Sequence, residues 1–181
     1  LLSNLRLDGI LQSAMDAIIT SDDRMQILLF NEAAERMFHC QAREAIGESV
    51  DRFLPARFRE AHRHHVEEFG RSRVTSRKMG QLGKVMGLRG NGEEFPVEAA
   101  ISHIVVEGKT FYTVILRDIT ERLRAEEQLR GIEERSRLAL EAGQLGAWEH
   151  DVATDLVQLD ARAQAIYRCG TGVSLGAMMA F

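Results

Sequence analysis

The stretch KVMGLRGNGEEFPVEAAISHIVVEGKTFYTVILRDIT (residues 84–120) decides the fold, because it holds three apolar runs separated by two explicit turns. The turn GNG (residues 90–92) separates the first two runs, and EGK (residues 107–109) separates the second and third. Both turns contain residues that tolerate positive φ. Such a pattern predicts three consecutive antiparallel strands joined as hairpins.

Upstream of these strands the sequence predicts two more strands and then short helices. The strands are expected at residues 17–20 and 26–30, around the turn-like residues 21–23. Asn31 is a good N-cap for the first short helix, and a histidine-rich helix is expected to follow Pro55. Two strands, helices and three strands predict an α+β domain, a five-stranded antiparallel sheet with helices on one face.

A helix is expected to leave the sheet at its last strand. Asp118 lies three residues before Glu121, the spacing of a capping box. Small and apolar residues then recur at 4,3 spacing along the helix: Ala125, Leu129, Ile132, Ser136 and Ala139. Fewer than four heptads leave two readings open: a linker helix that packs on its own domain, or a parallel dimer helix in which Leu129 and Ile132 make the contact.

The pattern divides the chain into four parts. We expect an N-terminal helix at residues 1–15, the main domain at 16–120, the linker helix at 121–142 and an incomplete second domain at 143–181. The last part repeats the opening plan of two strands and a short helix. We expect it to be disordered, swapped with a neighbour or truncated. The missing initiator methionine indicates a fragment of a longer protein.

Composition disfavours several classes of function. The chain is 45% hydrophobic and 28% charged with a formal net charge of -4, so it has no basic block for nucleic acid or anionic membrane. No apolar run approaches the roughly 20 residues that span a bilayer. Two cysteines without a CxxC motif fit a reducing cytoplasm. Phosphate loops, HEXXH and nucleophile-elbow motifs are absent, so we expect no enzymatic activity from this segment.

Three motifs resemble the PAS sensor family of bacterial signalling proteins. They are Asn-x-Ala-Ala-Glu at residues 31–35, Gly-x-x-Phe-Pro-Val-Glu at 92–98 and Asp-Ile-Thr at Asp118, Ile119 and Thr120. The resemblance covers about residues 7–129, and a Gly-x-Trp-Glu stretch at 146–149 resembles the front of a second PAS domain.

The resemblance implies a cytoplasmic sensory module that holds a small ligand between sheet and helices. It would signal through its C-terminal helix, with residues 118–120 as the junction between sheet and helix. Such modules commonly precede histidine kinase domains of two-component systems, or diguanylate cyclase domains. A homodimer is the expected assembly.

The segment FREAHRHHVEEF (residues 58–69) raises the question of a cofactor. On one helix, Phe58, His62, His65 and Phe69 share a stripe with 4,3,4 spacing, so we expect both histidines to face inward and His64 to face solvent. Resemblance to FixL-type oxygen sensors implies His62 as the proximal ligand of haem iron. It also implies an apolar wall of the haem pocket made by three alternating residues: Val97, Ala99 and Ile101.

The sequence departs from the pattern of the haem sensors, so an alternative role for His62 stays open. The haem sensors carry an arginine where this chain has Gly83, with Lys84 next to it. The alternative is that His62 is a core or boundary histidine that bonds to a backbone carbonyl or a carboxylate. Zinc is disfavoured because His62 and His65 lack further ligands nearby in sequence. A covalent flavin photocycle is disfavoured because Val50 stands where the reactive cysteine would be. A non-covalent flavin stays open.

Two hypotheses therefore remain. One is a sensory module that perceives a small ligand, gas or redox state. The other is a ligand-free PAS domain that serves dimerisation and spacing. The sequence leaves open the ligand, the output domain and the oligomeric state.

Overall fold

The computed structural model describes residue 9 and residues 11–71, 75–79 and 85–179. It divides into two compact units, Leu1–Leu123 and Arg124–Phe181, each of which is considered by itself. Most of the helix predicted at residues 1–15, and the Gly83 and Lys84 positions, lie outside the described residues.

The first unit is built on an antiparallel sheet in the order β2-β1-β6-β5. Two short strands share the remaining edge of β5, where β3 pairs with residues 99–102 and β4 with residues 94–97. The sheet therefore has five positions, which confirms the predicted five-stranded α+β fold. The strands are β1 (Ala17–Ser21), β2 (Ile27–Phe30), β3 (Ser76–Met79), β4 (Val85–Leu88), β5 (Glu94–Val106) and β6 (Lys109–Asp118).

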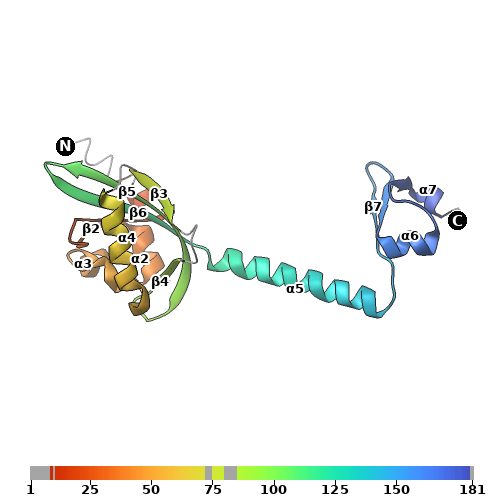
Figure 1. Cartoon of the computed structure of the whole chain (residues 1–181), viewed down its shortest axis with the longest axis horizontal. Helices are drawn as coiled ribbons and strands as arrows, with labels where there is room; N and C mark the ends of the chain where they lie inside the picture. The colour runs from red at the N-terminus through yellow and green to blue at the C-terminus, as the bar shows by residue number, and fades with distance from the viewer. Residues whose placement is uncertain (1–8, 10, 72–74, 80–84, 180–181) are drawn as a thin grey trace. The chain divides into compact units, whose positions relative to one another are not determined.

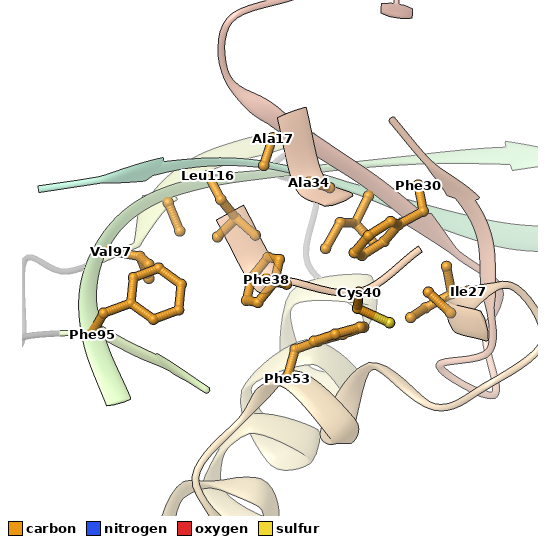
Figure 2. Close-up of a cluster of buried hydrophobic side chains, with 13 residues drawn as sticks. Ala17, Ile27, Phe30, Ala34, Phe38, Cys40, Phe53, Phe95, Val97 and Leu116 are labelled. Atoms are coloured by element: carbon orange, nitrogen blue, oxygen red, sulfur yellow. The ribbon is translucent and has the colours of Figure 1, made fainter. Parts of the chain in front are cut away.

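Helices cover one face of this sheet (Figure 1). They are α2 (Glu32–Phe38), α3 (Ala42–Ala45), the 3-10 turns η1 (Val50–Phe53) and η2 (Ala56–Phe58), and α4 (Arg59–Arg71). Figure 2 shows the core between the two layers, where Phe38 lies near Phe30, Phe53 and Phe95. The ring centroid of Phe38 lies 4.7 Å from that of Phe53 and 5.6 Å from that of Phe95. These aromatic contacts join α2, η1 and the sheet into one packed body.

Asn31 ties the start of α2 to the sheet. Its side-chain oxygen accepts hydrogen bonds from the backbone N–H groups of Ile18 (2.9 Å) and Ala34 (3.0 Å). Its side-chain nitrogen donates to the backbone carbonyls of Leu11 (3.0 Å) and Asp16 (3.1 Å). The fully buried amide is therefore satisfied on all sides, as a buried polar group requires.

The helix α5 (Thr120–Ala142) follows β6 and leads into the second unit. That unit holds a three-stranded sheet in the order β7-β8-β9 with two short helices. Its elements are β7 (Trp148–Asp151), β8 (Leu156–Leu159), α6 (Ala161–Tyr167), β9 (Val173–Ser174) and α7 (Leu175–Met178). None of the helices within the described ranges is long and apolar enough to cross a membrane.

The second unit repeats the cap of the first. Asp160 accepts hydrogen bonds from the backbone N–H groups of Ala147 (2.9 Å) and Ala163 (2.6 Å), at the same sequence spacings as the two bonds that Asn31 accepts. Each capped helix ends in a left-handed residue, His39 after α2 and Arg168 after α6. The same ββα plan thus occurs twice in the described chain.

Candidate ligand-binding site

A cavity of about 70 Å³ lies between the sheet and the helical layer of the first unit. Its walls are almost entirely apolar, and β5 supplies Val97, Ala99 and Ile101 from one face of the strand. The alternation along β5 predicted this shared face, because successive side chains of a strand point to opposite sides. Their role in binding a ligand stays a prediction.

His62 is the principal polar side chain on the helical side of the cavity. It is partly buried on α4, and its Nδ1 has no hydrogen-bond partner among the residues that the structure describes. Burial lowers the pKa of His62, although the nearby Asp51 carboxylate opposes this shift. The lowered pKa favours the neutral ring, which retains a nitrogen lone pair and is the form that accepts hydrogen bonds and binds metals.

The predicted stripe on α4 is wrong in part. The helix begins at Arg59, so Phe58 lies in η2 and is 37% exposed. Phe69 is buried with Val66 against Ile101, beside the cavity rather than in its wall.

His65 is exposed, with its ring 6.3 Å from that of His64, contrary to the inward orientation predicted for it. The inward-facing stripe of α4 is His62, Val66 and Phe69. Within the described residues, no group of three or more His, Cys, Asp or Glu side chains is placed to hold a metal ion. His62 is therefore the one of the three neighbouring histidines that the helix brings to the cavity.

A polar cleft of about 350 Å³ lies next to the cavity. The buried Asp51 of η1 lines it, and both Nε (2.8 Å) and Nη2 of Arg63 donate to the Oδ2 atom of Asp51. The other carboxylate oxygen, Oδ1, is buried without a partner among the described residues. The sequence offered no signal for this pair, because nothing in the spacing of Asp51 and Arg63 marks them as neighbours.

The junction at the end of the sheet is built around Asp118. Its Oδ1 accepts from the backbone N–H of Thr120 (2.8 Å), whereas the predicted capping box placed the partner at Glu121. The backbone N–H of Ile119 donates to the carbonyl of Pro96 on β5 (3.2 Å). Burial alone would raise the pKa of Asp118, but hydrogen bonds from Thr120 and Arg89 outweigh it and leave that pKa below its ordinary value.

Arg89 joins this junction to the core, and sequence reasoning missed it. Its Nη2 donates to Asp118 Oδ2 (2.6 Å), and its Nη1 donates to the backbone carbonyl of Met37 at the end of α2. Its guanidinium carbon lies 3.8 Å from the centre of the Phe95 ring. One side chain therefore contacts α2, β5 and the residues that lead into α5.

The predicted dimer contacts lie on α5, which buries none of its own side chains. Leu129 is 58% exposed and Ile132 is 56% exposed. Large apolar side chains are thus presented to solvent along this helix. Whether a second copy covers them stays a prediction.

Comparison with known proteins gives the same picture for the first unit. The family model described as PAS domain matches residues 15–121. The chain is 29% identical over 157 residues to the sensor protein FixL of Bradyrhizobium diazoefficiens, covering 84% of this chain and 31% of that protein. It is 30% identical over 124 residues to the oxygen sensor protein DosP of Escherichia coli, covering 66% of this chain and 15% of that protein. The chain thus spans about a third or less of the length of these relatives.

Solved structures agree on the fold. A PAS domain from Colwellia psychrerythraea superposes with a TM-score of 0.58 at 20% identity, covering 66% of this chain and 98% of that one. The PAS domain of an HTR-like protein from Haloarcula marismortui superposes with a TM-score of 0.54 at 23% identity, covering 65% of this chain and 93% of that one.

Proposed function

The chain belongs to the PAS domain family, and from this premise we propose that its first unit is a sensory module that binds a small ligand in the apolar cavity and signals through α5. The observation that carries the proposal is the cavity itself, enclosed between β5 and the histidine-bearing helix α4. Both named relatives are sensor proteins, which supports the same assignment.

The path from cavity to output runs along β4 and β5. Gly87 of β4 lines the cavity and lies two residues from Arg89, which bonds to Asp118. Val97 of β5 lines the cavity and follows Pro96, whose carbonyl accepts from Ile119. A ligand that shifts either strand therefore changes the contacts that hold the start of α5, and so changes the relative populations of the arrangements that this helix adopts. In a longer protein the recipient would be a histidine kinase or diguanylate cyclase domain.

Haem is the more specific candidate ligand, and His62 is the observation in its favour. His62 offers a neutral imidazole to the cavity, which is the donor that a proximal haem ligand requires. The cavity as it stands is too small for haem, because its volume is about 70 Å³ and pockets that hold larger ligands have volumes of roughly 300–1,000 Å³. Haem binding would therefore require α4 to move away from β5.

An absorption spectrum tests this candidate. The protein is measured as purified and after incubation with haem, beside His62→Ala and the matched control His65→Ala, whose ring is exposed on the same helix. A haem band that His62→Ala loses and His65→Ala keeps would support haem. A spectrum that haem leaves unchanged would exclude it, and a flavin band in the purified protein would replace it with non-covalent flavin.

The alternative function is dimerisation and spacing without a ligand. The observation that favours it is the exposure of Leu129 and Ile132 on α5. The two functions are compatible, since a dimer helix can also carry the signal of a bound ligand. Self-association and ligand binding are therefore measured separately.

A further inference from the structure

We propose that the polar cleft beside the cavity is the head-group subsite of one continuous binding site, and that its ligand is a small alkylammonium whose apolar tail enters the cavity. The inference rests on the proposed function, because the tail occupies the cavity assigned to the sensed ligand. It adds the chemical class of that ligand.

The cleft and the cavity share three wall residues, Met25, Val66 and Tyr112. On one side of these residues the site is apolar and about 70 Å³ in volume; on the other it is polar and about 350 Å³. A ligand that fills both must have an apolar end and a polar end. The small inner volume limits the apolar end to a few carbon atoms.

The charges of the cleft favour a cation. Three carboxylates line it, on Asp23, Asp51 and Glu67, against two guanidinium groups, on Arg24 and Arg63. Tyr112 responds to this field: burial raises the pKa of its phenol, and the charges of Asp23 and Glu67 raise it further. A head group with a negative charge would meet the same repulsion.

Asp51 lines the cleft and carries an acceptor to which no described residue donates. The residue is 6% exposed, and its place is fixed because its own N–H donates to Ser49 Oγ (3.2 Å). Arg63 occupies Oδ2, while Oδ1 is buried and lacks a donor among the described residues. A buried acceptor of this kind is stabilised by a donor, and an ammonium group carries three in its primary form.

His62 offers a second acceptor close by. Its charge environment includes Asp51, and its Nδ1 is likewise buried and unpartnered within the described part of the chain. A neutral imidazole accepts through one ring nitrogen. Two buried acceptors are thus left for the donors of the head group, Asp51 Oδ1 on the cleft side and His62 Nδ1 on the cavity side.

Binding of three probes that each contain four carbon atoms and differ in head group tests the proposal: n-butylammonium, n-butanol and n-butyrate, each titrated into the whole chain and followed by backbone amide NMR shifts. We expect butylammonium to bind tightest and butyrate weakest, with about tenfold between ammonium and alcohol, the effect of one hydrogen bond to a charged group. Asp51→Asn should reduce ammonium affinity to that of butanol. The control Glu48→Gln, an exposed carboxylate outside the cleft, should leave all three affinities unchanged.

Two further variants, Glu67→Gln and Ala99→Leu, test the head-group subsite and the apolar cavity separately. If Asp51→Asn fails to fold, Glu67→Gln on the exposed side of α4 should still weaken butylammonium selectively. Ala99→Leu fills the cavity and should abolish binding of all three probes. Equal binding of the three probes, tightest binding of butyrate, or unchanged ammonium binding in Asp51→Asn or Ala99→Leu overturns the head-group assignment.

The same titration distinguishes failure of the head-group subsite from failure of the proposal that the cavity binds a ligand. Butanol binding that Ala99→Leu removes, without any preference for ammonium, leaves the sensory cavity standing and refutes the subsite. If none of the three probes binds, the subsite proposal fails, and the absorption spectra with haem decide separately whether the cavity binds a ligand.

Discussion

Replacing Arg89 by methionine is expected to lower the free energy of unfolding of the first unit by about 3 kcal/mol. The side chain is only 11% exposed and makes charge-assisted hydrogen bonds to Asp118 and to the carbonyl of Met37. Hydrogen bonds to charged groups are each worth about 1.5–3 kcal/mol. Methionine keeps the apolar contact with Phe95, and water can hydrate part of the Asp118 carboxylate. The loss of unfolding free energy therefore stays below the summed energies of the hydrogen bonds that Arg89 makes.

Urea denaturation followed by far-UV circular dichroism measures this loss. The matched control is Arg117→Met, which breaks the exposed pair with Asp16 and should cost clearly less. Trp148, the single tryptophan, lies in the second unit, so its fluorescence reports a transition that Arg89→Met should leave in place.

A double-mutant cycle with Asp118→Asn should give a coupling energy of at least about 1 kcal/mol. Equal losses for Arg89→Met and Arg117→Met, or a coupling energy near zero, would show that Arg89 does not hold the junction.

Three further predictions concern the partly buried His62, the cap of α2 and the exposed helix α5. Folding lowers the pKa of His62 from its ordinary value of 6.5, so the contribution of His62 to the free energy of unfolding should be fully present above pH 6.5. Below that pH the free energy of unfolding should fall by at most about 1.4 kcal/mol per pH unit. In urea denaturation, His62→Gln should flatten this part of the pH profile, and an unchanged profile would refute the prediction. Asn31→Ala removes four backbone partners and should cost about 2–4 kcal/mol in the same assay, a loss below 1 kcal/mol contradicting the network. Ile132→Glu should weaken self-association in sedimentation equilibrium while Arg130→Glu, off the predicted seam, should not; equal effects would rule out the seam.

The sheet and the helix caps are predictable from sequence because their signals are local. Turn residues mark the hairpins of β4, β5 and β6, and alternation along β5 identifies its inward face. β3 escaped notice because its four residues, SRKM, form an edge strand without apolar alternation. The orientation predicted for His65 is wrong because the stripe from which it follows includes Phe58, which precedes the start of α4.

The polar contacts of the candidate site depend on tertiary structure and left no trace in sequence spacing. Asp51 and Arg63 are 12 residues apart, and Arg89 reaches Met37 across 52 residues and Asp118 across 29. No helical or strand period connects such pairs, so only the packing of η1 on α4, and of β4 on α2, brings them together. The predicted wall of the cavity was thus accessible to sequence reasoning, whereas its polar entrance was not.

If a second copy of the chain covers α5, the response of the protein depends on its concentration in the cell. A helix of 23 residues is about 34 Å long, yet this one buries none of its side chains. Most helices in proteins owe their stability to packing rather than to propensity. The stiffness of α5 should therefore increase when a second surface covers it, and mass action would then make transmission along it depend on copy number. Two cells with the same amount of ligand but different expression of this chain would then respond with different strength.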